Sequence, residues 1–393
     1  MDAQEEKYIK MTTPPVEKLI CRLAAPCIIS MLVTSFYNMA DTYFVGMLKS
    51  NAATAAVGVV FSVMAVIQAV GFFFGQGSGN YISRELGRKN YTGASQMAAT
   101  GFVSALATGL AICVLGLCFL EPLAVFLGST PTILPHTTAY LRVILLGAPW
   151  MCASFVLNNQ LRFQGSASYA MVGIVTGALL NIVLDPVMIF ALDLGVAGAG
   201  WATILSQLVS FCLLLAGTRR GGNIQLKLRN FRFSGHYFSW IFKGGLPSLA
   251  RQGLASVATI CLNNVSMAYG DAAIAAMGVV QRVTMFGASA MIGFGQGFQP
   301  VCGFNYGAGL YSRVRKGFWF CVKVSTVALL AIAALGYGFA PKLVALFRDD
   351  PQVVAYGALA LRYQCITFCL QGWVVMGNMM QQSMGKTVPA TFM

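Results

Sequence analysis

Residues 50–77 read SNAATAAVGVVFSVMAVIQAVGFFFGQG, and residues 270–297 read GDAAIAAMGVVQRVTMFGASAMIGFGQG. Twelve of these 28 positions are identical without a gap, far more than chance gives even for two apolar stretches. The same offset continues outside the pair, where Pro131 corresponds to Pro351 and Gly165 to Gly385. A repeat of this length indicates a chain built from two copies of one unit.

The composition indicates that lipid surrounds most of the chain. Of the 393 residues, 57% are hydrophobic and only 10% are charged, whereas a soluble domain carries about 25% charged residues. This excludes a soluble two-domain protein and a disordered or fibrous chain. Segments that cross a bilayer must be helices or closed barrels, and the strict alternation of a barrel is absent. The sequence therefore predicts an all-α polytopic membrane protein.

The chain contains ten apolar segments of the length that a membrane helix needs. They cover about 23–45, 53–77, 95–120, 139–160, 169–192, 197–217, 243–268, 273–297, 317–340 and 356–380. Six precede the second copy, so both copies enter the membrane from the same side as parallel repeats, and repeats of this kind usually enclose a central site in transporters.

We therefore divide the chain into an N-terminal segment (1–22), a first lobe (23–217), a linker (218–242) and a second lobe (243–393). The second lobe is expected to be incomplete, with four helices against six, and the chain to be C-terminally truncated.

Basic residues concentrate on one side of the predicted membrane. If the N-terminus is cytoplasmic, the loops on the outer side hold only Lys49, Lys342 and Arg348. The inner segments hold Lys7, Lys10, Lys18, Arg22, Arg84, Arg88, Lys89, Arg162, Arg219, Arg220, Lys227, Arg229, Arg232, Lys243, Arg313, Arg315, Lys316 and Lys386. This asymmetry predicts a cytoplasmic N-terminus. It also explains the net charge of +14 without a nucleic-acid partner.

Two carboxylates, Asp41 and Asp185, fall well inside apolar spans. An ionisable group at membrane depth is costly, and by default it indicates function. Tyr37 and Asn38 precede Asp41 by four and three residues and so share its helix face. An alternative for Asp41 is a place near the outer interface, where its side chain would only reach toward water.

Asp185 has a similar polar neighbourhood. Asn181 lies four residues before it, and Thr203 on the next helix is expected to meet both across the lobe. A carboxylate among such neutral partners can hold and release a proton or a cation. We predict a proton or cation site at Asp41, Asn181, Asp185 and Thr203, with Na⁺ as a possible ligand of the first three.

Several further residues are candidates for shape or for a cavity. Pro26 and Pro186 each remove a backbone hydrogen bond, so each permits a bend that is either only shape or a hinge sensitive to protonation. The paired GQG segments favour close packing or helix termination over a role in binding substrate. Arg251 and Arg282 lie deep in their spans and are expected to line a wet cavity.

Motifs for other kinds of chemistry are missing from the sequence. It has no HExxH, P-loop or GxSxG motif, and its eleven cysteines form no CxxC pair. We interpret the cysteines as small buried apolar residues rather than as a disulfide or metal framework. The sequence therefore predicts neither an enzyme nor a bound metal or cofactor.

The segment LAAPCIISMLVTSFYNMADTYFVG (23–46), the paired GQG segments and NIVLDP (181–186) together resemble the multidrug and toxic compound extrusion (MATE) family. Within it, the chain is similar to the prokaryotic branch of MepA-type and DinF-type exporters. The resemblance implies two six-helix lobes that open as a V in a prokaryotic plasma membrane. It also implies export of bulky, often cationic amphiphiles in exchange for H⁺ or Na⁺. We expect the protein to act as a monomer.

Family positions transfer onto residues of this chain. The cation-binding group corresponds to Asp41, Asn181, Asp185 and Thr203, and the candidate cavity residues are Tyr37, Asn38, Tyr140 and Asn158, with Arg282 added from its depth. The sequence thus predicts a secondary active multidrug exporter that works by alternating access. Two alternatives stay open. One is a flippase for lipid or polysaccharide precursors, which Arg251 and Arg282 would suit, and the other is an inactive truncated membrane fragment.

Overall fold

A computed structural model describes residues 3–47, 51–267, 269, 271–347 and 350–392. Among these residues every regular element is a helix, which confirms the all-α prediction. Lys49 and Arg348, two of the basic residues assigned to outer loops, lie outside the described residues.

The first half of the chain begins with a short helix that the sequence did not predict, α1 (Ala3–Thr12). It is followed by α2 (Val16–Gly46), α3 (Asn51–Gly87), α4 (Tyr91–Cys118), α5 (Leu120–Phe126), α6 (Leu134–Phe163), α7 (Ala167–Pro186), the π-helix η1 (Val187–Ala191) and α8 (Gly195–Gly217). The second half contains the 3-10 turn η2 (Leu228–Asn230), α9 (Gly235–Met267), α10 (Asp271–Gly307), α11 (Tyr311–Gly338), α12 (Ala340–Phe347), α13 (Pro351–Met384) and α14 (Thr387–Phe392).

Within the described residues, seven helices are long and apolar enough to cross a membrane, and α13 adds an eighth if its two halves form one span. Those halves, 351–368 and 370–384, meet at a bend of 50°. Two more long helices, α9 and α10, lie where the sequence predicted the spans 243–268 and 273–297. The helices therefore agree with a polytopic membrane protein.

The two halves of the chain repeat the same helices. Both bounds of α10 match those of α3 at the offset seen in the sequence, and the bounds of α11 match those of α4 in the same way. The turns that follow α6 and α13 also correspond, since Gly165 and Gly385 have φ values of +78° and +80°. Only glycine adopts such positive φ values without steric cost. The structure thus confirms the duplicated unit.

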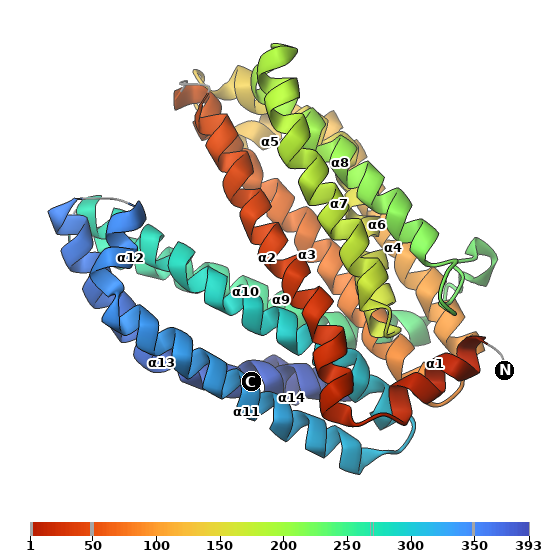
Figure 1. Ribbon diagram of the computed structural model, residues 1–393. Helices are drawn as coiled ribbons and strands as arrows, with labels where there is room; N and C mark the ends of the chain where they lie inside the picture. Colours follow the sequence, from red (N-terminus) through yellow and green to blue (C-terminus); the bar gives the residue numbers. More distant parts are fainter. Residues whose placement is uncertain (1–2, 48–50, 268, 270, 348–349, 393) are drawn as a thin grey trace.

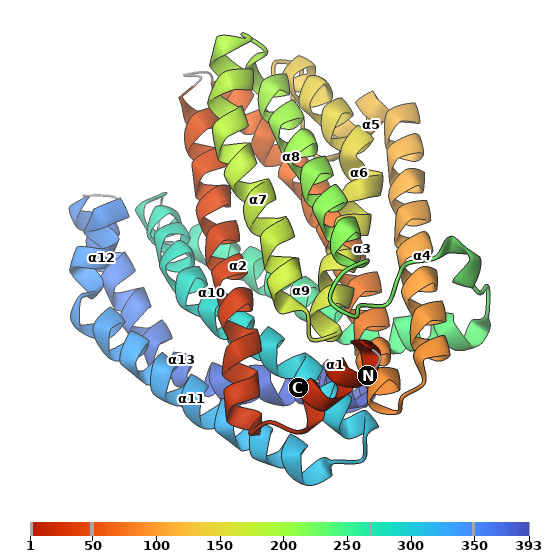
Figure 2. The ribbon, with the colours of Figure 1, turned by 45° about the vertical axis from the view of Figure 1, so that its right-hand side comes forward.

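The helices form two groups that spread apart from a common end (Figures 1 and 2). We call α2–α8 the first lobe and α9–α14 the second lobe. The lobes contact one another mainly through α2 with α10, α3 with α9, and α3 with α10. This contact lies next to α1, and we call it the closed end. Helices α5 and α12 mark the opposite, splayed end of each lobe.

At the closed end, the backbones of α3 and α10 cross without intervening side chains. A Cβ atom added to Gly307 would overlap the carbonyl oxygen of Arg84, and one added to Gly87 would overlap that of Phe304. These two contacts are equivalent under the repeat, because Gly307 is the counterpart of Gly87 and Phe304 that of Arg84. A Cβ added to Gly303 would likewise overlap the Ser83 hydroxyl. Small residues let helices approach this closely in a bilayer.

The GQG segments extend this pattern. A Cβ on Gly77 would overlap the carbonyl oxygen of Ile241 in α9, and one on Gly297 would overlap the backbone of Ala24 in α2. Close packing is therefore the correct interpretation of these glycines. Helix termination is wrong, because α3 and α10 continue well beyond them to Gly87 and Gly307.

We predict that Gly307→Ala destabilises the closed end by about 1–3 kcal/mol, since overpacking a tight contact costs that much. The matched control is Gly278→Ala in the same helix, where an added Cβ has no neighbour within 4 Å. There, removal of a helical glycine should be neutral or stabilise by about 0.5–1 kcal/mol. Thermal unfolding of the detergent-purified variants measures both effects, and equal shifts would contradict the crossing.

Candidate functional site

The first lobe contains a buried polar cluster on α7 and α8. Asp185, Asn181 and Thr203 are 0%, 1% and 0% exposed. Asn181 and Asp185 share a face of α7 because they are one turn apart. With the Asn181 amide nitrogen toward the carboxylate, Nδ2 donates to Asp185 Oδ2 over 3.1 Å, and the amide oxygen accepts from the Thr203 backbone N–H over 3.2 Å. The structure thus brings these three predicted residues together.

Helices α2 and α6 complete the cluster. Helix α2 packs along α7 and presents Tyr37 and Asp41 to it. The Tyr37 and Tyr140 side chains both interact with Thr203, and both lie within range of the charges of Asp41 and Asp185. The two carboxylates also lie within electrostatic range of each other. We call Tyr37, Asp41, Tyr140, Asn181, Asp185 and Thr203 the acid cluster.

Both carboxylates of the acid cluster have an oxygen without a partner. Asp41 Oδ1 and Asp185 Oδ1 are buried and accept no hydrogen bond. Among the described residues, the ion pairs that form include neither acid. Buried carboxylates without a cationic neighbour are costly as anions, and a proton or a cation would remove that cost. Such oxygen groups suit a hard cation such as Na⁺ as well as H⁺.

The other predicted residues lie apart from this group. Asn38 is an exposed residue of α2, and Arg282 is an exposed residue of α10. Asn158 is buried and its Nδ2 donates to the Ala170 carbonyl over 3.1 Å, which ties α6 to α7. Its repeat counterpart Asn378 makes the same contact with Ala390. The structure therefore places Asn158 in helix packing rather than between the lobes.

The two prolines differ in their local structure. Pro26 lies inside α2, which continues through it, and its carbonyl accepts from Ser30 Oγ over 2.8 Å. Pro186 is the last residue of α7 and is followed directly by the π-helix η1. Single turns of π-helix are frequent at functional sites. The hydrogen-bond pattern thus changes immediately after Asp185.

A second polar group, at the closed end, was missed from the sequence. The sequence pattern places Arg162 in a loop on the inner side of the membrane. In the structure its side chain is buried, with only 2% of it exposed. Its Nη2 donates to Asn159 Oδ1 over 2.7 Å and its Nη1 to Gln296 Oε1 over 2.6 Å. Gln76 Nε2 also donates to Asn159 Oδ1, over 3.1 Å. Arg162 therefore bridges α6 of the first lobe and α10 of the second.

The central glutamines of the two GQG segments, Gln76 and Gln296, also belong to this polar group. The interpretation of the flanking glycines as packing residues did not predict this role of the glutamines. Gln299 Nε2 lies 3.4 Å from Gln76 Oε1 and 3.3 Å from Gln382 Oε1. Gln382 Nε2 in turn donates to the Ser248 hydroxyl and to the Gly244 carbonyl, each over 2.7 Å. A polar layer thus joins α3, α9, α10 and α13 beside the glycine crossing.

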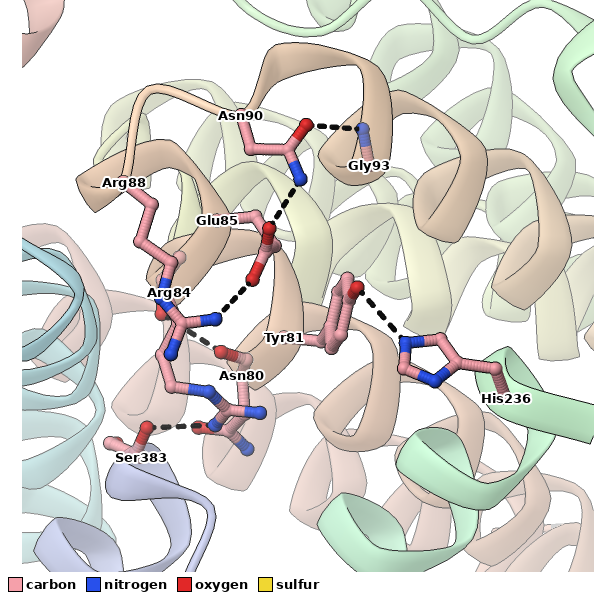
Figure 3. A network of polar contacts seen from close by, with 10 residues as sticks. Asn80, Tyr81, Arg84, Glu85, Arg88, Asn90, Gly93, His236 and Ser383 are labelled. Atoms are coloured by element: carbon pink, nitrogen blue, oxygen red, sulfur yellow. Dashed lines mark hydrogen bonds and ion pairs between the residues drawn. The ribbon is translucent and has the colours of Figure 1, made fainter.

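Closer to the end of α3, a further network joins the lobes (Figure 3). Arg84 Nη1 donates to the Ser383 carbonyl of α13 over 2.9 Å, and its guanidinium lies 5.0 Å from the ring centroid of Trp240 in α9. Next to it, Glu85 accepts from Arg88 over 2.8 Å and from Asn90 Nδ2 over 2.6 Å. The span predicted from the sequence ends at residue 77, yet residues 78–87 are all buried here.

Helix α1 covers the closed end. Lys7 Nζ donates to Ser166 Oγ over 2.9 Å and also to Asn223 Oδ1 in the segment before α9. The Met11 carbonyl accepts from Asn305 Nδ2 of α10 over 3.3 Å. Burial lowers the pKa of Lys7 from 10.5 to about 7. The N-terminal segment is thus part of the lobe contact rather than a free tail.

The lowered pKa of Lys7 predicts a pH-dependent contribution to stability. Because the folded pKa lies below the unfolded one, the unfolded chain binds more protons between pH 7 and 10.5, and stability rises with pH across that window. We expect Lys7→Met to remove this rise from pH 7 to 9 in thermal unfolding. Lys10→Met, at an exposed position, is the control. Parallel pH profiles of wild type and Lys7→Met would refute the prediction.

Duplicated lobes of membrane helices that meet at one end, with a buried polar site in one of them, are typical of two-lobe membrane transporters. The sequence model of the MatE family matches residues 26–187 and 247–393. The chain therefore belongs to the MATE family, whose members are transporters and not enzymes. This confirms the resemblance seen in the sequence.

Known proteins support this assignment over nearly the whole chain. The multidrug export protein MepA of Staphylococcus aureus (strain MSSA476) is 27% identical over 394 residues, which cover 99% of this chain and 86% of MepA. A structure of MATE in the straight conformation matches with a TM-score of 0.92 at 29% identity. An outward-facing multidrug resistance MATE transporter of the MOP superfamily matches with a TM-score of 0.91 at 29% identity. Each structural match covers 98% of this chain and 86% of the other.

Proposed function

We propose that this protein is a secondary active multidrug exporter that exchanges bulky, often cationic amphiphiles for H⁺ or Na⁺. The observation that carries the proposal is the acid cluster, where Asp41 and Asp185 each keep a buried oxygen without a partner. The similarity to MepA, a multidrug export protein, supports the substrate class. Family membership supports transport without a cofactor other than the coupling ion.

The distribution of basic residues supports one orientation of the protein in the membrane. Lys7, Arg84, Arg88 and Lys89 lie at the closed end, and basic residues favour the cytoplasmic side. We infer that the closed end faces the cytoplasm and that the structure is outward-facing. The similarity to an outward-facing MATE transporter is consistent with this. We further propose that the protein acts as a monomer in the plasma membrane of a prokaryote.

The acid cluster suggests how ion and substrate are coupled. In the outward-facing state, H⁺ or Na⁺ from outside neutralises Asp41 and Asp185, and the substrate leaves. Neutralisation changes the interactions of α2 with α7, next to the π-helix that follows Pro186. The lobes then close outside and open inside, where the ion is released. Inward movement of one charge yields about 2.3 kcal/mol per 100 mV.

We predict that Asp185→Asn and Asp41→Asn each reduce gradient-driven transport at least tenfold. The amide keeps the shape of the side chain but cannot bind and release a proton. The double variant should be no worse than the less active single variant, because the two acids act as one site. The measurement is uptake of a cationic dye into everted membrane vesicles under imposed proton and sodium gradients, applied separately.

The control for this experiment is Asp193→Asn, at an exposed position after η1. Wild-type rates in both acid variants would refute ion exchange at the acid cluster. Dependence on only one of the two imposed gradients would identify the coupling ion. If no dye moves but labelled lipid changes leaflets, the activity is that of a flippase.

A further inference from the structure

Two arginines near the closed end are buried without an acidic partner. Arg162 of α6 is 2% exposed, and its Nε has no hydrogen-bond partner. Arg251 of α9 is half-buried, and its Nη1 is buried without a partner. Within the described ranges, the ion pairs that form contain neither residue. An arginine cannot lose its proton to relieve this cost, so such a group needs an anion.

The two side chains converge from opposite directions. Arg162 lies near the C-terminal end of α6, at the closed end, whereas Arg251 lies about one turn past Ser248 toward the splayed end of α9. Side chains of a helix lean toward its N-terminus. Helix α6 runs toward the closed end and α9 runs away from it, so this tendency shortens the distance between the two guanidinium groups. Their charges are close enough to interact.

The repeat shows that helix packing does not require either charge. The counterpart of Arg162 in the second lobe is Gln382. The counterpart of Arg251 in α2 is Met31, or Ser30 if Pro26 is aligned with Pro247, and neither is charged. Met31 Sδ lies 3.9 Å from Gln296 Nε2, and the repeat-equivalent pair is Arg251 and Gln76. Gln76 donates to Asn159, which also accepts from Arg162. The duplicated fold therefore does not by itself account for either charge.

We propose that Arg162 and Arg251 form a binding site for a carboxylate or phosphate group of the transported substrate. The substrate class then includes amphiphiles that carry an acidic group, in addition to purely cationic ones. This inference rests on the proposed export function.

The anion site becomes accessible when the closed end opens during the transport cycle. In the present state Gln296 of the second lobe accepts from Arg162 Nη1. When the closed end opens, Gln296 moves away with α10, and Nη1 of Arg162 loses its partner, while Nε already has none. Hydrogen bonds from a guanidinium to a carboxylate or phosphate oxygen are stronger than those to a neutral amide oxygen. The substrate would then replace the glutamine as the partner of Arg162.

Direct binding tests the site without transport. Purified protein is titrated with inorganic phosphate, against KCl at matched ionic strength, and thermal unfolding is followed. We expect saturable stabilisation of the wild type, at least tenfold weaker apparent affinity in Arg251→Gln, and an intermediate value in Arg251→Lys. Arg142→Gln, at an exposed position near the splayed end, is the control and should match the wild type. No stabilisation beyond that of KCl would overturn the proposal.

Transport separates this proposal from the proposed function. In everted vesicles, Arg251→Gln should lower uptake of a dicarboxylate dye at least tenfold and leave uptake of a cationic dye unchanged. Unchanged uptake of both dyes by Arg251→Gln would overturn the anion site while leaving export intact. If the wild type transports neither dye, the proposed function fails, and the phosphate titration still decides whether the anion site exists.

Discussion

The close crossing of α3 and α10 is the contact on which the arrangement of the lobes depends. In a bilayer, helices gain little from hydrophobic burial against each other, because lipid is equally apolar. Association therefore relies on close van der Waals contact and on polar bonds across the interface. Gly87, Gly303 and Gly307 supply the first by leaving no side chain at the crossing. The polar layer around Arg162 and Gln296 supplies the second.

The crossing also explains where function is placed. Because the lobes spread apart from the closed end, each lobe is free to carry its own polar group along its length. The first lobe holds the acid cluster, and α6 and α9 together hold the two arginines. The two acids lie on α2 and α7 and the two arginines on α6 and α9, so the ion site and the anion site that we propose do not neutralise each other. Duplication provided a symmetric frame, and the charged residues break that symmetry.

Much of this was predictable from the sequence because lipid imposes simple rules. The constant offset between the two GQG-terminated segments revealed the repeat. The spacing of Asn181 and Asp185 placed both on one helix face, where the structure has them. Thr203 was expected to meet them from the next helix, and it does. These predictions depend on helix periodicity and on the rarity of acids at membrane depth, both of which are local properties.

The closed end was harder to predict from the sequence. The hydropathy of a polar residue is the same whether water or other protein groups surround it. Residues 78–87 are polar, so they resemble a loop, yet α3 continues through them into the lobe contact. Arg162 was counted as a loop charge for the same reason, although its side chain leans back into the interface. The helix α1 is too polar to signal burial. Such contacts exist only once two distant segments are brought together.

The alternating access that we propose requires the contact of α10 with α2 and α3 to separate in each transport cycle. A disulfide between Ser35→Cys of α2 and Ser289→Cys of α10, in a background without reactive native cysteines, tests this requirement, because the two hydroxyl oxygens lie 3.1 Å apart across the lobe contact. We expect oxidation to stop dye transport in membrane vesicles and a reductant to restore it. Transport at an undiminished rate with the cross-link complete would contradict it.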